Sequence, residues 1–264
     1  MTAAGERIDT TEDAFLGGSL RISQLAAGYR AGLDAVLLAA AAPVRDGRGE
    51  QVLDVGAGVG VVGLSVARRA AEVCVTLIER EPTQAELCRL NIDRNGLAER
   101  ARLLIGDVGK PLGEQPTLKS LAGSFDHVLA NPPYQVEGTA TMAALPAKAA
   151  ANAMRRDGLH QWLRFMAAMA RPGGTATMIH RADSLDQVLA AFSGRFGRLL
   201  VYPIFPRQGA AAHRVLVQGI KGSRAPLQLR AGLILHATGH GFRPEVDAIL
   251  RGGAALDLGA ASAS

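Results

Sequence analysis

Long apolar runs are missing from this sequence. The longest stretch of apolar residues, Ala35 to Pro43, is far shorter than the roughly 20 residues that a membrane-spanning helix needs. The N-terminus also lacks a basic segment followed by an apolar one, which is the pattern of a secretory signal peptide. We therefore expect a cytoplasmic protein that has no membrane partner.

Cysteine is equally scarce. The only two cysteines, Cys74 and Cys88, have neither the spacing of a metal site nor that of a redox motif, so we expect reduced thiols in the core. His236 and His240 have the spacing of a helical metal site, but HATGH lacks the glutamate of a zinc-protease motif and contains Gly239. A strand end followed by a turn is expected there, and we assign no metal.

Lysine is also rare, so arginine carries most of the net charge of +5. Arginine suits phosphate recognition because its planar fork binds oxyanions bidentately, although a solvated basic surface would have the same composition. The candidates for phosphate contacts are Lys148, Arg155, Arg156, Arg207 and Arg214.

Apolar strand-like runs alternate with helical patterns along residues 51–180. Strands are expected at residues 51–55, 73–79, 101–106, 125–130 and 175–180. Helices are expected from about Val61, from Pro82 and near residues 159–170. This alternation predicts a doubly wound α/β fold, in which helices cover both faces of a parallel sheet.

Two further regions flank this alternating part. Before it, GGSLRISQ predicts a short strand, and residues 33–42 predict a helix that Asp34 can cap and Pro43 ends. After it, residues 199–206 and 212–221 predict an antiparallel hairpin. We expect an N-terminal extension at 1–45, a catalytic domain at 46–222 and a C-terminal extension at 223–264.

A glycine-rich segment, LDVGAGVG, follows the first strand of the alternating region. Gly56, Gly58 and Gly60 allow the backbone to turn sharply and to approach a ligand near the N-terminus of a helix. A dinucleotide fingerprint would need glycine where the chain has Val61, which weakens a nicotinamide interpretation.

Acidic residues follow the next two strands. Glu79 lies about 20 residues beyond the glycine segment, where a carboxylate can accept hydrogen bonds from ribose hydroxyls. Asp107 follows the third strand, where it could accept a bond from an adenine amino group. Each acid alone is more often a helix cap or a surface charge, but together with the glycines they predict an adenosine pocket at the carboxyl edge of the sheet.

The fourth strand is followed by Asn-Pro-Pro-Tyr, residues 131–134. The prolines fix the backbone, so the side-chain oxygen of Asn131 and the carbonyl of Pro132 form a rigid pair of acceptors that suits a planar NH2 group. Such bonds favour the pyramidal, nucleophilic nitrogen that forms as an amine attacks a methyl sulfonium. Tyr134 can stack on the base. The alternative is a strand end whose prolines discourage further pairing.

Together these motifs resemble the Rossmann-like S-adenosylmethionine-dependent methyltransferases, in which NPPY is the catalytic motif of the amino-methyltransferases. The resemblance implies a seven-stranded, mostly parallel sheet with a C-terminal antiparallel hairpin. It implies cofactor contacts from Asp54, Gly56, Gly58, Gly60, Glu79, Asp107, Val108 and Asn131. It implies catalytic roles for Asn131, Pro132, Pro133 and Tyr134.

Other segments indicate the substrate. GYRAGLDAVLLAAA and PIFPRQGAAAHRVLVQGIKG are similar to segments of bacterial tRNA adenine-N6 methyltransferases of the valine-tRNA type, which act on adenine 37. That family often has an aromatic residue where this chain has Gln135 and can have a polar one where it has Leu33. The resemblance implies adenine N6 in tRNA. A protein glutamine amide and guanine N2 of ribosomal RNA are the alternatives, and a non-catalytic RNA-binding module is disfavoured by the intact motifs.

Overall fold

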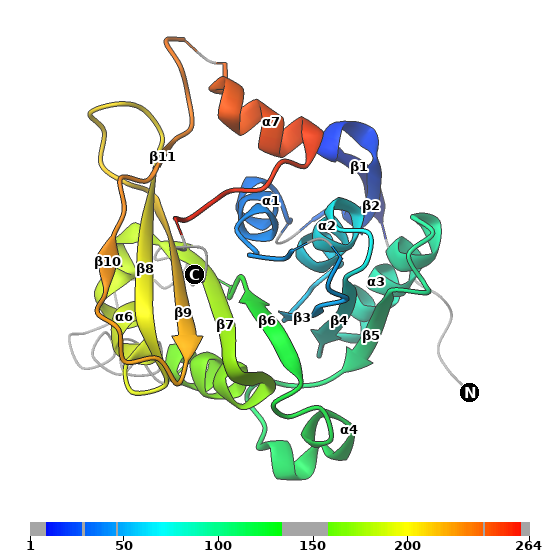
Figure 1. Ribbon diagram of the computed structural model, residues 1–264. Coiled ribbons are helices and arrows are strands. Elements are labelled where there is room, and N and C mark those ends of the chain that lie inside the picture. Colours follow the sequence, from blue (N-terminus) through cyan, green and yellow to red (C-terminus); the bar gives the residue numbers. More distant parts are fainter. Residues whose placement is uncertain (1–8, 28–29, 46, 134–157, 240, 260–264) are drawn as a thin grey trace, which may run out of the picture.

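A mixed sheet runs through the molecule, which we describe from a computed structural model covering residues 9–27, 30–45, 47–133, 158–239 and 241–259 (Figure 1). Within these residues the sheet has nine strands in the order β10-β8-β9-β7-β6-β3-β4-β5, with β11 beside β8. Its seven longer strands, β3 to β9, are those expected from the sequence, and β10 and β11 extend the sheet beyond them.

The parallel half of the sheet follows the predicted alternation. Its elements are β3 (Gln51–Val55), α2 (Val61–Arg69), β4 (Cys74–Glu79), α3 (Pro82–Arg94), β5 (Ala101–Ile105), η2 (Leu112–Glu114), α4 (Pro116–Lys119) and β6 (Phe125–Ala130). Strand β3 lies between β4 and β6, and both pairings are parallel. The strand order therefore reverses at β3, which brings the loops after β3 and β6 together.

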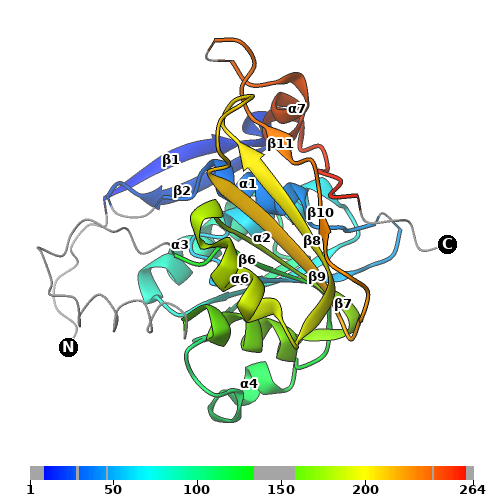
Figure 2. The same cartoon turned by 90° about the vertical axis from the view of Figure 1, so that its left-hand side faces the viewer.

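Helices cover both faces of the sheet, as the views in Figures 1 and 2 show. Helices α1 (Leu33–Ala40), α2 and α3 pack on one face, while α4, residues 158–169 and α6 (Leu185–Phe192) pack on the other. Neighbouring residues of β3 alternate between the two cores, since Val52 belongs to the first and Leu53 to the second.

The C-terminal hairpin is confirmed, with a first strand longer and a second strand shorter than expected. Strands β8 (Phe196–Phe205) and β9 (Arg214–Lys221) are antiparallel, and β9 also pairs antiparallel with β7 (Ala170–Arg181). The short η3 (Ala182–Ser184) links β7 to α6. Strands β10 (Gln228–Leu229) and β11 (Leu233–Ile234) then pair parallel with β8, and α7 (Pro244–Gly252) follows.

The N-terminal segment forms more structure than the sequence indicated. The predicted strand is β2 (Leu20–Leu25), and it pairs with an unexpected strand, β1 (Thr10–Phe15), through the turn η1 (Leu16–Gly18). Helix α1 begins after Gly32, and no side chain caps it, so the predicted cap by Asp34 is wrong. Asp34 lies in the first turn of the helix, where its Oδ2 accepts a hydrogen bond of 2.8 Å from Nε of Arg214.

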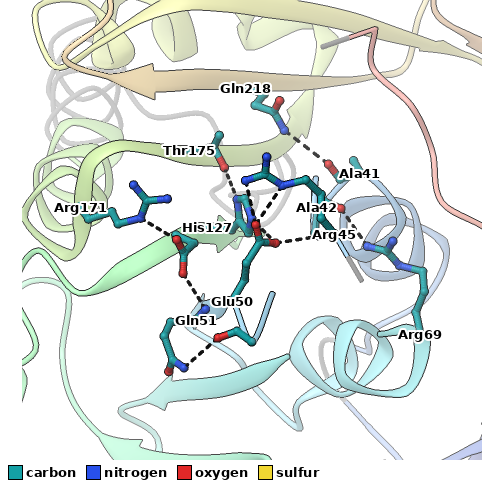
Figure 3. A network of polar contacts seen from close by, with 12 residues as sticks. Ala41, Ala42, Arg45, Glu50, Gln51, Arg69, His127, Arg171, Thr175 and Gln218 are labelled. Carbon is teal, nitrogen blue, oxygen red and sulfur yellow. Dashed lines mark hydrogen bonds and ion pairs between the residues drawn. The ribbon is translucent and has the colours of Figure 1, made fainter. Parts of the chain in front are cut away.

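A buried polar network lies at the amino edge of the sheet (Figure 3). Oε2 of Glu50 is 3.1 Å from Nε2 of His127, whose Nδ1 is 2.9 Å from the hydroxyl of Thr175. The backbone and guanidinium of Arg45 also donate to Glu50. Burial opposes the ionisation of Glu50, but the bonds from His127 and Arg45 outweigh it and lower the pKa to about 2.

The two thiols differ in depth. Cys88 is buried in α3, as expected, whereas Cys74 is exposed. The expectation of a core position is wrong for Cys74, the first residue of β4, because its side chain points away from the core that buries its neighbours Val73 and Val75. Within the described residues no helix is long and apolar enough to cross a membrane.

Candidate functional site

The turn between β3 and α2 depends on glycine. Gly56, Gly58 and Gly60 have φ values of 65°, 56° and 95°, a left-handed range that side chains rarely adopt. A Cβ on Gly60 would lie 2.9 Å from Sγ of Cys88, so this glycine allows α2 to pack closely on its neighbours. A Cβ on Gly56 would lie 2.4 Å from the ring of Trp162. Gly60 is therefore needed for the close packing of α2, and Gly56 for the close approach of Trp162.

Asp54 lies beneath this turn. Its side chain is buried, and Oδ2 accepts a hydrogen bond of 2.8 Å from the backbone amide of Gly63 in the first turn of α2. Burial raises the pKa of Asp54 to about 7; the bond from Gly63 opposes this rise, and the negative charge of Glu79 adds to it. Asp54 therefore holds the helix start and titrates near neutral pH.

Glu79 fixes the opposite side of the turn. Its Oε2 accepts from the amide of Gly58, and its Oε1 accepts from the amides of Arg80 and Glu81, each at 2.8 Å. A carboxylate has about four lone-pair positions, so these bonds leave room for a ligand hydroxyl. The sequence indicated a ligand contact for Glu79 but not this second role in shaping the loop.

The next strand supplies Asp107 and Val108. The side-chain amide of Gln115 both accepts from the backbone N–H of Asp107 and donates to its carbonyl, each at 2.9 Å. Oδ1 of Asp107 accepts from the amide of Gly109 at 2.8 Å and lies 3.6 Å from the guanidinium of Arg80. The loop after β5 is therefore held in place, with one carboxylate oxygen still available.

The NPPY segment leaves the sheet from β6, next to β3. Asn131 is half-buried, Pro132 is buried and Pro133 is exposed. Tyr134 lies outside the described residues, as do Gln135, Lys148, Arg155, Arg156 and His240. Only the first three residues of the predicted catalytic motif can therefore be placed.

These segments surround a cavity of about 370 Å³ at the carboxyl edge of the sheet. Of the residues predicted from the sequence, it is lined by Asp54, Gly56, Gly58, Glu79, Asp107, Val108, Asn131 and Pro133. Gly60 and Pro132 are not part of its wall. The structure thus brings together residues from four separate loops, as expected for the carboxyl ends of neighbouring parallel strands.

Several wall residues could not be found by sequence reasoning. They include Gln24 from β2, Ala31, Ala35, Arg80, Gln84, Gln161 and Trp162. Trp162 is the only tryptophan of the chain, yet nothing in its spacing links it to the glycine turn. No group of three or more His, Cys, Asp or Glu side chains suited to a metal ion occurs in the described part of the chain.

The glycine turn, the two acids after successive strands and the cavity define an α/β protein of the nucleotide-cofactor-binding class. Comparisons with known proteins specify the class further. Residues 32–164 match the family model of the methyltransferase small domain. A tRNA1(Val) (adenine(37)-N6)-methyltransferase from Shewanella sp. (strain W3-18-1) is 33% identical over 172 residues, which cover 65% of this chain and 68% of that relative.

Solved structures agree with this assignment. A crystal structure from Agrobacterium tumefaciens, described as a predicted O-methyltransferase, has a TM-score of 0.71 and 36% identity, covering 84% of this chain and 98% of that chain. Pyrococcus horikoshii TYW2 in complex with MeSAdo shares the fold at a TM-score of 0.51 and 14% identity, covering 82% of this chain and 73% of that chain.

The chain belongs to the methyltransferase small domain family, and it is an S-adenosylmethionine-dependent methyltransferase of Rossmann-like fold.

Proposed function

We propose that the cavity of about 370 Å³ holds S-adenosylmethionine. All the residues expected to bind it, except Gly60, line this cavity. Glu79 retains an acceptor position for ribose hydroxyls, and Asp107 has an oxygen available for an adenine amino group. The glycine turn lets the ligand approach the backbone, so the donors and acceptors of the site suit this cofactor.

The substrate in this proposal is the exocyclic N6 amine of an adenine in tRNA, at the position 37 type of site. When bound, the cofactor supplies an electrophilic methyl group on a sulfonium. The chain orients the amine: the side-chain oxygen of Asn131 and the carbonyl of Pro132 accept its two N–H bonds, which directs the nitrogen lone pair toward the cofactor site. The rigid proline backbone keeps both acceptors in place as the nitrogen becomes pyramidal.

The observation that carries this proposal is the intact NPPY segment directly after β6, with Asn131 and Pro133 in the wall of the cofactor cavity. The name of the Shewanella relative, a tRNA1(Val) (adenine(37)-N6)-methyltransferase, supports the choice of base and RNA. The same motif chemistry would serve a glutamine amide or guanine N2, so the experiment has to separate these acceptors.

The test supplies purified enzyme and methyl-labelled S-adenosylmethionine with total tRNA, with ribosomal RNA and with a glutamine-containing peptide in separate reactions. We expect label in N6-methyladenosine of tRNA, identified by nucleoside mass spectrometry. Nucleosides from a deletion strain should lack the same modification. Label confined to the peptide or to N2-methylguanosine would contradict the proposed substrate.

A further inference from the structure

A larger cavity, of about 710 Å³, lies among the C-terminal elements. Its wall combines the end of β8, the link after it, β11, α7 and residues 254–256. It shares no lining residue with the cofactor cavity. Figures 1 and 2 show β11 and α7 at the same end of the molecule. This cavity is thus separate from the cofactor cavity, and we call it the C-terminal cavity.

The C-terminal cavity lies at the carboxyl end of β8, and the direction of the strands relates this end to Asn131. The strand register connects Ala130 of β6 to Met178, then to Val217, and finally to Val201 of β8. Strands β6 and β8 run in the same direction, so their carboxyl ends lie at one edge. Three strand spacings of about 4.8 Å set β8 roughly 15 Å to the side of β6, and β8 continues from Val201 to Phe205, about 13 Å further along the strand.

The wall chemistry suits a nucleotide. Leu233 and Ile249 are buried and give an apolar floor, and the half-buried rings of Tyr202 and Phe205 contribute aromatic surface. The exposed Arg207 belongs to the same wall. Unpaired bases stack on aromatic side chains, and a guanidinium binds phosphate oxygens.

The charges of the cavity are divided between its two ends. Burial, and then the charges of Asp257 and Glu245, raise the pKa of Tyr202, so an anionic group is favoured only at the end beside Arg207. The guanidinium of Arg243 is 3.5 Å from Glu245, which offsets the one carboxylate in the wall. Arg207 donates to the carbonyl of Gly239 at 3.3 Å, and it forms no ion pair with any carboxylate in the described ranges. Its remaining N–H donors are available for a phosphate.

We propose that the C-terminal cavity binds a nucleotide of the substrate RNA that lies several positions away from the methylated adenine. This inference rests on the proposed function, because it takes the RNA as the substrate. The two displacements combine to roughly 20 Å, which at about 3.4 Å per stacked nucleotide corresponds to about six nucleotides, within the reach of one loop. The base stacks on Tyr202, which faces the same core as Ile249 of α7, and its phosphate binds Arg207.

The test compares two charge reversals, Arg207→Glu and Arg224→Glu. Arg224 is also exposed, but it follows β9 at the opposite edge of the sheet, so it is a matched control. We expect Arg207→Glu to raise the KM for tRNA about tenfold or more while kcat and the Kd for S-adenosylmethionine stay as in the wild type. The loss of one phosphate contact weakens RNA binding without affecting the chemistry or the cofactor. Arg224→Glu should leave all three constants within about twofold, because Arg224 lies at the opposite edge of the sheet.

A second measurement locates the contact directly. RNA carrying 4-thiouridine beside the target loop is cross-linked to the wild-type enzyme, and the labelled peptide is identified by mass spectrometry. We expect cross-links within residues 202–210. If the wild type methylates tRNA but both variants show the same KM and the cross-links lie elsewhere, the C-terminal cavity is not a nucleotide site. If the wild type methylates no RNA, the proposed function falls, and the nucleotide assignment falls with it.

Discussion

Two carboxylates, Asp54 and Glu79, flank the glycine turn, and they differ in hydrogen bonding. Asp54 has a pKa raised from 3.8 to about 7, whereas Glu79 accepts bonds from three backbone amides. In the unfolded chain Asp54 would ionise at its ordinary pKa. Between pH 3.8 and about 7 the folded state therefore binds more protons, and the free energy of unfolding falls as the pH rises through this window.

Asp54→Asn removes this titration while keeping an oxygen that can accept from Gly63. We expect the variant to gain stability relative to the wild type as the pH rises from about 4 to about 8, since only the wild type then has to bury a charge. Denaturant unfolding at several pH values measures the difference. Two stability curves that remain parallel over this range would contradict the raised pKa.

Asn131 allows binding and chemistry to be separated. Asn131→Ala removes an acceptor that matters most as the amine becomes pyramidal, so we expect kcat to fall on the order of a hundredfold. The Kd for S-adenosylmethionine, measured by calorimetry, should change little, because the other wall residues remain. A variant that turns over at the wild-type rate would exclude the proposed role of the side-chain oxygen.

The contact between the helix at residues 158–169 and the glycine turn shapes the wall of the cofactor cavity. The ring of Trp162, in the helix at residues 158–169, packs so closely on Gly56 that a Cβ would lie 2.4 Å from it. We expect Gly56→Ala to lower the melting temperature and to weaken cofactor binding, since it adds this clash to the cost of about 1–3 kcal/mol for a left-handed non-glycine residue.

The double variant Gly56→Ala, Trp162→Ala separates these two causes. Removing the ring relieves the clash but leaves the backbone strain, so the double variant should be less destabilised than the sum of the two single changes. A coupling of about 0.5–3 kcal/mol is the usual size for residues in contact. Strictly additive melting data would show that the ring does not press on the turn.

The order of elements could be predicted because apolar runs and helical patterns alternate clearly between residues 51 and 180. The same logic placed Glu79, Asp107 and Asn131 at one edge, since parallel strands end together. Strands β10 and β11 have only two residues each and are too short to give a pattern, and β1 is mostly exposed. The contact of Trp162 with Gly56 depends on tertiary packing, so no local spacing could have shown it.

The hydrogen-bond network around Glu50 joins segments that are far apart in the chain. His127 lies 77 positions from Glu50 in the sequence, and Thr175 lies 48 beyond His127. The pKa of Glu50 is lowered from 4.5 to about 2, so its ionised form stabilises the fold above pH 4.5, and this contribution is lost as the pH falls toward 2.

Glu50→Gln should therefore destabilise the protein at neutral pH. We expect a loss of about 3 kcal/mol in the free energy of unfolding, because breaking one side of a buried pair leaves its partner groups uncompensated. The difference from the wild type should shrink as the pH is lowered toward 2, where about half of the wild-type carboxyl is also neutral. Denaturant titrations at pH 7 and at acidic pH would contradict this if the difference stayed constant.

Because one thiol is exposed and the other is buried, the protein can be labelled at a single cysteine. Cys74 is exposed at the start of β4, on the edge of the sheet opposite the cofactor cavity, whereas burial strongly raises the pKa of Cys88. Because the thiolate is the reactive form, a maleimide dye or biotin should attach at a single position. A chain tethered to a sensor surface through Cys74 would present its cavity edge to the solution, and thiol counting with Ellman's reagent should find one fast-reacting group in the native protein.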